Sequence, residues 1–283
     1  MIQVITCHFN PCCYRAPLEN YFAFRKHMEQ FGVSVRTIEL IYDDRPSMIP
    51  GAMHVRGSSV DSLLWQKESL LNALIDTSSA EYIAWIDPDL YFTNPSWVLQ
   101  AEYALRESYD VIQLFYDARV IEKTGTVSGA SWPSVARAFL SNERFWDFSK
   151  YHAGFAWAAR GDWLRKHRLY DKLVAGCGDT QMALAWCCRP DVSGWNPELA
   201  ADYTKWVVQQ GTVRVGCIPG TVMHMYHGSN ANRRRGEQRM FHAHVAPSHF
   251  TRSDDGVLSW TDKADPAVVR AIRERFYARN EDA

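Results

Sequence analysis

The stretch YIAWIDPDLYF, residues 82–92, decides the fold of this chain. It begins with the run YIAWI, whose apolar and aromatic side chains are typical of a strand buried on both faces of a sheet. Asp87 and Asp89 follow directly, with only Pro88 between them. An unpaired carboxylate is costly to bury and two neighbouring carboxylates repel, so the pair needs a compensating charge. The segment therefore predicts a core strand that ends at a charged site.

Strands and helices alternate around this segment over the first 115 residues. The amphipathic segment 17–32, with Pro17 near its start and Gly32 at its end, is typical of a helix. Expected strands cover residues 3–8, 33–40, 81–87 and 109–115, and expected helices cover residues 17–32, 60–76 and 96–108. This order implies right-handed crossovers, and hence an α/β fold with a mostly parallel central sheet flanked by helices.

After residue 115 the pattern is less regular. Gly, Ser, Trp and Pro cluster in TGTVSGASWPS (124–134), which indicates a loop. Further helices are expected at residues 161–175, 179–189 and 197–210, strands within 212–227, and a closing helix within 265–283.

The composition narrows the classes of function. The chain has 47% hydrophobic and 22% charged residues, and its net charge of −1 gives no global attraction to nucleic acid or anionic membrane. No apolar run approaches the ~20 residues that cross a bilayer, and the opening MIQVITCHFN lacks the pattern of a signal peptide. The neighbouring pairs Cys12–Cys13 and Cys187–Cys188 fit neither a disulfide framework nor a zinc site. We therefore expect a cytoplasmic protein.

The carboxylate pair is a candidate metal site. In an open α/β sheet, ligands bind beyond the carboxyl ends of the strands, where Asp87 and Asp89 are expected. Two carboxylates there can coordinate a hard divalent cation, which in turn can bridge to a diphosphate. In the alternative interpretation, Asp87 caps a turn and Asp89 faces solvent.

A second charged segment, TVMHMYHGSNANRRR (221–235), lies far downstream. A histidine from it, His224 or His227, could complete the coordination of a metal held by Asp89. The arginines at 233–235 offer donors to phosphate oxygens. Histidines satisfied within a core and a solvated arginine face are the alternatives.

The segment AGCGDTQMALAWC (175–187) contributes Asp179. This residue is either a general base that faces an acceptor hydroxyl or the N-cap of the helix that follows. Gly154, in HAGFAWAARGDWL (152–164), permits close backbone approach and could line a donor sugar. Trp132, Trp146 and Phe148 form either an acceptor platform or part of the core.

In their order along the chain, these pieces resemble the GT-A fold glycosyltransferases, the nucleotide-diphospho-sugar transferases, including those found in phages. The matching segments span roughly residues 3–235 and are VITCHFNP (4–11), LLWQKESLLN (63–72), WIDPDLYF (85–92), GCGDTQMALA (176–185) and HMYHGS (224–229). The resemblance implies a Rossmann-like GT-A domain over residues 1–283, with a nucleotide-binding half (1–115), an acceptor-side half (116–250) and a helical tail (251–283).

The resemblance also implies roles for individual residues. Asp87 would approach the ribose and the metal, Asp89 would bind the metal, and His227, or failing it His224, would be the late metal ligand. Asp179 matches the catalytic base of inverting members; their acidic pair is often Glu-Asp, whereas Gly178 precedes Asp179 here, so a retaining mechanism stays open. The implied donor-binding residues are Asn10, Arg15, Trp65, Lys67, Asp87, Gly154, Arg233 and Arg234.

The expected activity is transfer of a sugar from a nucleotide-diphosphate donor, UDP-linked, to an acceptor hydroxyl with Mn²⁺ or Mg²⁺. The acceptor is open among a glycan, a protein, a small molecule and a hydroxylated DNA base, which would have to be flipped out of a duplex. A viral source would place the reaction in the host cytoplasm. The alternatives are a nucleotidyltransferase or phosphohydrolase, although the first loop HFNPCCYR lacks glycine, and a non-catalytic sugar-binding or nucleic-acid-binding protein. The sequence leaves the oligomeric state open.

Overall fold

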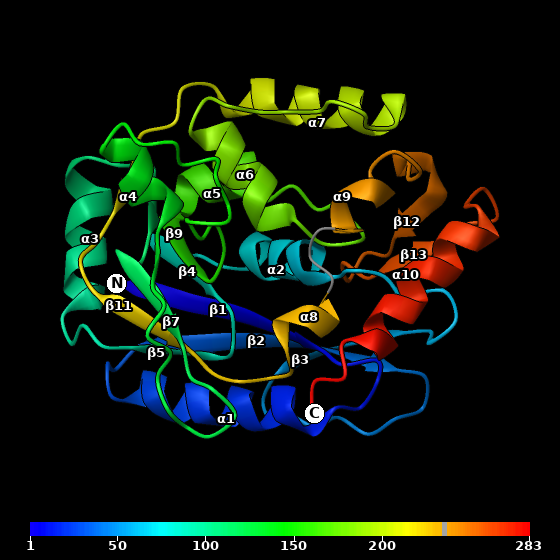
Figure 1. Cartoon of the computed structure of the whole chain (residues 1–283), viewed down its shortest axis with the longest axis horizontal. Helices are drawn as coiled ribbons and strands as arrows, with labels where there is room; N and C mark the ends of the chain where they lie inside the picture. Colours follow the sequence, from blue (N-terminus) through cyan, green and yellow to red (C-terminus); the bar gives the residue numbers. More distant parts are fainter. Residues whose placement is uncertain (234–236) are drawn as a thin grey trace.

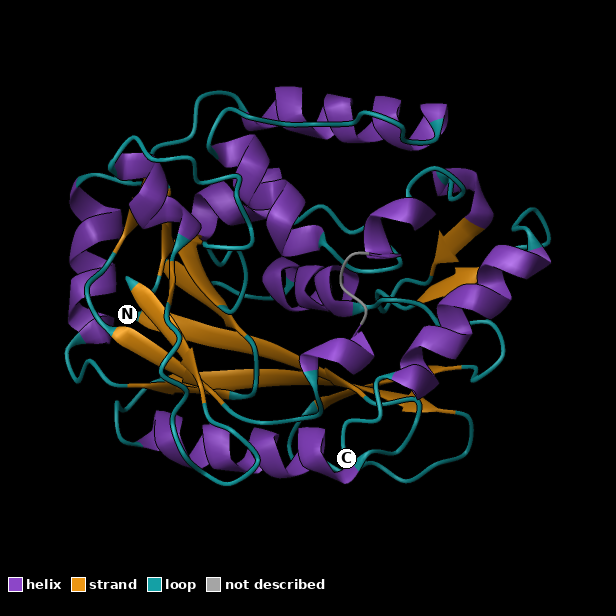
Figure 2. Ribbon diagram, viewed as in Figure 1, coloured by secondary structure: helices purple, strands orange, loops and turns teal. Residues whose placement is uncertain are grey.

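The computed structural model describes residues 1–233 and 237–283, and it confirms the α/β fold with a mostly parallel central sheet. Figure 2 shows this sheet between layers of helices. The strand order is β10-β6-β9-β4-β1-β2-β3, and every neighbouring pair is parallel except those that β9 makes with β4 and β6. The strands are β1 (Ile2–Phe9), β2 (Ser34–Tyr42), β3 (Met53–Gly57), β4 (Tyr82–Ile86), β6 (Val111–Gln113), β9 (Ala156–Arg160) and β10 (Val215–Cys217).

Helices cover both faces of the large sheet (Figure 1). Helices α1 and α3 pack on one face, whereas α2, α5 and α6 pack on the other, with α7 outside α6. The helices are α1 (Arg15–Glu29), α2 (Lys67–Asp76), α3 (Trp97–Glu107), α4 (Val135–Leu140), α5 (Gly161–His167), α6 (Gly178–Trp186), α7 (Pro197–Gln210), α8 (Asn230–Arg233), α9 (Gln238–Phe241) and α10 (Pro266–Ala278).

The position of β4 in the middle of the sheet explains its apolar sequence. All of its side chains are buried, and they alternate between two hydrophobic cores. Ile83 and Trp85 belong to the core beneath α2, α5 and α6, whereas Tyr82, Ala84 and Ile86 belong to the core beneath α1 and α3. A strand that is covered on both faces needs a continuous apolar run, as the sequence predicts.

A second, smaller sheet begins just after the two aspartates. Its order is β5-β11-β7-β8, formed by β5 (Leu90–Phe92), β11 (Thr221–His224), β7 (Asp117–Val120) and β8 (Trp132–Pro133). Strand β5 pairs antiparallel with β11, and the register sets Leu90 opposite His224. This pairing therefore places His224, and with it His227 three residues later, close to Asp89.

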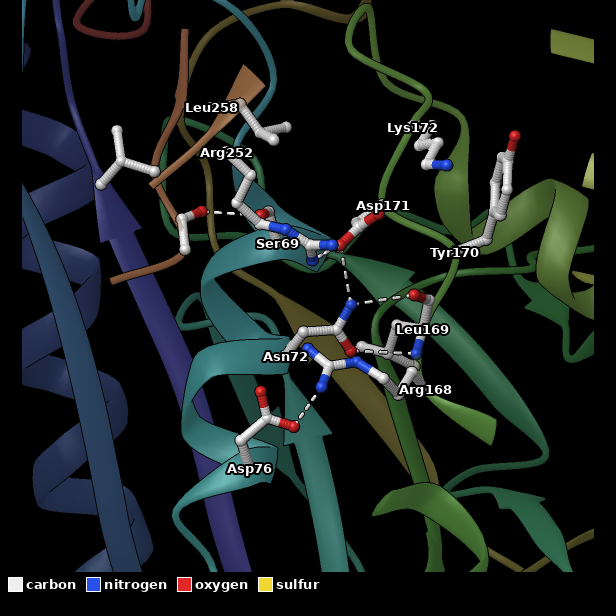
Figure 3. A network of polar contacts seen from close by, with 12 residues as sticks. Ser69, Asn72, Asp76, Arg168, Leu169, Tyr170, Asp171, Lys172, Arg252 and Leu258 are labelled. Atoms are coloured by element: carbon white, nitrogen blue, oxygen red, sulfur yellow. Dashed lines mark hydrogen bonds and ion pairs between the residues drawn. The ribbon is translucent and has the colours of Figure 1, made fainter. Parts of the chain in front are cut away.

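Some expected elements differ from the structure. The helix expected at 161–175 ends at His167, because Arg168 takes a left-handed φ of 56° and α2 side chains hold the following chain as a loop. The Asn72 amide accepts from Leu169 N (3.0 Å) and donates to Leu169 O (2.9 Å), while Asp76 pairs with Arg168 (Figure 3). Side-chain contacts from α2, distant in the sequence, thus replace the helical hydrogen bonds.

Other boundaries also shift. The helix expected from residue 60 begins only at Lys67, whereas the closing helix expected within 265–283 is confirmed as α10 (Pro266–Ala278). Strands β3 and β9 and a hairpin of β12 (Phe250–Arg252) and β13 (Leu258–Trp260) were not expected. The division of the chain at residues 115 and 250 stays a prediction. None of the described helices has the length and hydropathy to cross a bilayer.

Candidate active site

A cavity of about 680 Å³ opens at the carboxyl ends of β1 and β4. Distant parts of the chain form its wall: the end of β1 and the loop after it, the start of α2, the turn at 87–89, residues 146–155, the start of α6, His224 and His227, and residues 276–281. Ligands of open α/β sheets bind at this edge, so the cavity is the candidate active site.

Three potential metal ligands converge at one side of the cavity. The Oδ2 atom of Asp89 lies 2.9 Å from Nε2 of His227 and 3.4 Å from Nε2 of His224, and the two Nε2 atoms are 3.1 Å apart. The backbone also fixes Asp89, whose carbonyl accepts from Met225 N at 2.8 Å. The structure thus brings together Asp89 and both of the histidines between which the sequence could not choose.

The chemistry of this triad fits a divalent cation. The ligand atoms of Asp89, His224 and His227 all lie within 4.8 Å of one another. Oδ1 of Asp89 is buried and has no hydrogen-bond partner in the described part of the chain, so it is available as a further ligand. Burial raises the pKa of Asp89, but the two histidines outweigh it and hold the pKa well below its usual range. Asp89 is therefore ionised, and a carboxylate with two imidazoles suits a divalent transition metal.

Asp87 lies outside this triad and pairs with Lys67 instead. The Lys67 ammonium lies 2.6 Å from Oδ1 of Asp87 and 2.9 Å from Oδ2 of Asp179, so one cation bridges two carboxylates. Burial lowers the pKa of Lys67, but Asp179 and Asp87 raise it well above its ordinary value, which keeps the side chain charged. Burial also raises the pKa of Asp87, against the lowering effect of Lys67. Lys67 is thus the charge that keeps the two carboxylates together.

Asp179 is not the N-cap of α6. The cap is Cys177, in the left-handed conformation with φ 76°, and Asp179 lies within the first turn. Its carboxylate lines the cavity and contacts Lys67. The helix-cap interpretation of Asp179 is therefore wrong, and its carboxylate faces the cavity.

Two glycines allow the close packing around Asp179. A Cβ atom on Gly154 would lie 3.0 Å from Oδ2 of Asp179, and one on Gly178 would lie 2.2 Å from Oε1 of Glu68. Glu68 is buried, and its burial, followed by the nearby Asp179, raises its pKa well above the usual range. Gly178 directly precedes Asp179, and a buried glutamate from α2 fills the space beside it. Glu68 could not be predicted from the sequence, because nothing local relates α2 to residue 178.

The early loop contributes unequally to the cavity. Asn10 lines it and fixes the loop, donating to Tyr14 O (2.6 Å) and accepting from Tyr14 N (3.0 Å). Trp65 also lines it, in edge contact with the Phe9 ring at 5.2 Å between centroids. Arg15 is absent from the wall, and its exposed side chain pairs with Glu19 at 3.1 Å.

The side chains of the basic cluster lie outside the described residues, and only two of the three aromatic candidates line the cavity. Arg233 ends α8, and its side chain lies outside the described residues, as do Arg234 and Arg235. Trp146 and Phe148 line the cavity, whereas Trp132 belongs to β8 and does not. The Arg189 guanidinium lies 3.7 Å above the Trp146 ring, and that of Arg239 lies 5.7 Å above Phe148.

Residues after α10 also line the cavity, which the sequence did not predict. The Arg279 guanidinium lies 5.5 Å above the Trp65 ring, and Glu281 contacts His227 at 3.2 Å. His227 and Arg279 lower the pKa of the Glu281 carboxylate to about 2, although burial raises it. These contacts join residues far apart in sequence, so no local pattern could reveal them.

Comparison with known proteins gives likeness only at the level of structure. No protein-family model matches the sequence, and no curated protein matches it. Glucosyl-3-phosphoglycerate synthase of Mycobacterium tuberculosis, solved with Mn²⁺, UDP and phosphoglyceric acid, is similar with TM-score 0.44, 13% identity and coverage of 92% of this chain and 86% of that one. For a Drosophila β-1,4-galactosyltransferase 7 mutant with manganese, UDP-Gal and xylobiose, the values are 0.43, 14%, 96% and 98%.

The TarS protein of S. aureus with UDP-GlcNAc is also similar, with TM-score 0.42, 13% identity and coverage of 88% of this chain and 68% of that one. These scores and identities are low, so the likeness carries no conclusion about function. Fold and site together define an α/β protein with a candidate divalent-metal centre at the carboxyl edge of its sheet.

Proposed function

We propose that this chain is a GT-A-type, metal-dependent glycosyltransferase that moves a sugar from a nucleotide-diphosphate donor, UDP-linked, to an acceptor hydroxyl. One observation carries the proposal: the triad of Asp89, His224 and His227 shares a cavity with the Lys67–Asp179 pair at the carboxyl edge of the sheet. Buried charges are costly unless they are paired, and clusters of paired charges in a cleft are typical of catalytic sites. A non-catalytic binding module has no need of them.

In this proposal, Asp89, His224 and His227 hold Mn²⁺ or Mg²⁺. When bound, the ion compensates the charge of the diphosphate leaving group. Imidazole nitrogens suit a transition metal better than Mg²⁺, which favours Mn²⁺. Asp87, which Pro88 separates from Asp89 and which pairs with Lys67, is assigned to the donor side of the cavity, between the metal and the ribose.

Asp179 is assigned the role of general base. Its carboxylate lines the cavity and would accept the proton of the acceptor hydroxyl as that oxygen attacks the anomeric carbon and the nucleoside diphosphate leaves. Lys67 would orient the carboxylate until then. This assignment makes the enzyme inverting.

The donor is assigned to the side of the cavity formed by the early loop, Trp65 and Gly154, and the acceptor to the side formed by Trp146 and Phe148. Aromatic faces stack against flat partners, so the acceptor carries a sugar ring or a base beside its hydroxyl. The cavity of about 680 Å³ has the size of a small-molecule site.

The test is a panel of nucleotide sugars with Mn²⁺, Mg²⁺ or a chelator, read as release of nucleoside diphosphate and as thermal shift. We expect release with one donor and Mn²⁺, loss with the chelator, and loss in Asp89→Asn. The half-buried Asp117, which pairs with Arg137 away from the cavity, supplies the matched control Asp117→Asn. Absence of release and of thermal shift with every donor would refute the proposal. Pyrophosphate release from a nucleoside triphosphate and a sugar phosphate would support the nucleotidyltransferase instead.

A further inference from the structure

The last residues of the chain cross the candidate site and tie its parts together. In Figure 1 the C-terminus lies beside the first turn of α1. The Asp282 carboxylate there accepts from the backbone N–H groups of Arg15 (3.0 Å) and Ala16 (2.8 Å). The Tyr226 hydroxyl donates to the carbonyl of Ala283 at 2.7 Å. Residues 279–283, called the C-terminal segment below, thus join the early loop to the turn that carries the histidines.

Within this segment, Glu281 is the residue that reaches the metal triad. It is buried, 8% exposed, and its Oε1 lies 3.2 Å from Nδ1 of His227. Arg279 compensates its charge, with Nε at 2.7 Å and Nη2 at 2.5 Å from the same oxygen. The segment also packs tightly on the turn after His227: a Cβ atom on Gly228 would lie 3.0 Å from the carbonyl oxygen of Asn280. Glu281 is therefore held in place from both sides.

The two ring nitrogens of His227 face different groups. Nδ1 faces the Glu281 carboxylate, which can accept a hydrogen bond from it, whereas Nε2 lies 2.9 Å from Oδ2 of Asp89 and 3.1 Å from Nε2 of His224. A histidine coordinates a metal through an unprotonated ring nitrogen, and a partner on the other nitrogen orients the ring.

We propose that Glu281 is a positioning residue of the metal centre, which accepts a hydrogen bond from Nδ1 of His227 and thereby orients Nε2 toward the ion. The inference rests on the proposed function, because it presupposes that Asp89, His224 and His227 bind a metal. Glu281 acts only through His227 and is not assigned any contact with the ion, the donor or the acceptor.

The first measurement is calorimetric titration of the full chain with Mn²⁺ alone. Loss of an outer partner of a metal ligand weakens binding by roughly 10–100-fold, which is the expected change in Kd for Glu281→Ala. Glu281→Gln keeps an oxygen that accepts from Nδ1, so we expect a smaller loss. Asp282→Ala is the matched control, because it removes the neighbouring carboxylate and its contacts with Arg15 and Ala16 but none with His227.

The outcomes are distinct. Weaker binding in Glu281→Ala with unchanged binding in Asp282→Ala supports the inference. Equal affinity of Glu281→Ala and the unaltered protein overturns it, as does an equal loss in both variants, since the segment would then act only as a clamp. An unaltered protein that binds no Mn²⁺ overturns the metal centre itself, and with it the proposed function.

A second measurement needs no variant and covers the case in which Glu281→Ala does not fold. The ¹⁵N shifts of the His227 ring in the protein loaded with diamagnetic Zn²⁺ report which nitrogen binds the ion. We expect the ion on Nε2 and the proton on Nδ1 in the unaltered protein. An ion on Nδ1 would overturn the assignment.

Discussion

Protonation of His242 should destabilise the fold in mildly acidic solution. This side chain is 2% exposed, follows α9 directly, and packs against Trp195 with 4.6 Å between ring centroids. Burial lowers the pKa of His242 from 6.5 to about 4, so the folded state resists a proton that the unfolded state accepts. Stability is therefore complete above pH 6.5, falls as the pH drops below 6.5, and levels off near pH 4.

The two pKa values set the magnitude. Between pH 7.5 and pH 5, linkage gives a loss of about 2 kcal/mol from this residue alone, using about 1.4 kcal/mol for each pKa unit. His242→Phe keeps an aromatic ring against Trp195 but cannot titrate, so it should lose about 2 kcal/mol less than the unaltered protein. The assay is urea unfolding of both proteins at pH 7.5 and at pH 5. Losses from carboxylates common to both proteins cancel in the comparison.

The exposed His244, two residues further on, supplies the control. His244→Gln should follow the unaltered protein at both pH values. Equal losses in His242→Phe and the unaltered protein would refute the reasoning, because the buried ring would then take up its proton without cost. This result also bears on the candidate active site, because Gln238 and Arg239 of α9, which His242 follows directly, line the cavity.

Three further predictions concern the cavity directly. Asp89→Asn should weaken Mn²⁺ binding more than Asp87→Asn, since only Asp89 belongs to the triad; calorimetry that ranks them equally would contradict the assignment. Asp179→Asn should abolish sugar transfer at saturating donor yet leave Mn²⁺ affinity and the melting curve nearly unaltered, because a base acts only in the chemical step; full activity would exclude the base role. Gly178→Ala should lower the free energy of unfolding by about 1–3 kcal/mol through overpacking against Glu68. Glu68→Ala in the same chain should recover part of that loss in denaturant unfolding, and complete independence of the two changes would contradict the packing argument.

Much of the fold followed from local pattern. The run from Tyr82 to Ile86 predicted a strand covered on both faces, and Pro197–Gln210 was predicted to the residue as a helix. The pattern failed where side chains from elsewhere replaced local hydrogen bonds. At Arg168 the helix ends because Asn72 and Asp76 of α2 bind the chain, and the sequence of residues 161–175 does not predict this end.

The candidate site shows the same limit. The sequence named Asp89, His224 and His227, but only the β5–β11 register explains why both histidines, rather than one, reach the aspartate. It left Asp179 between a cap and a base, and the left-handed Cys177 at the cap position decided against the cap. Glu68 and Glu281 stayed hidden, because each acts on a partner more than fifty residues away in the chain.

The turn at residues 87–89 joins the large sheet to the small one, and this has a mechanical consequence. Asp89 stands at that joint, His224 ends a strand of the small sheet, and His227 is tethered to the C-terminal segment. An ion bound by Asp89, His224 and His227 would link three segments of the molecule that are anchored separately. Loading and unloading the metal would then stiffen and loosen the joint as a whole, and amide hydrogen exchange along β11 would register the difference without any substrate being turned over.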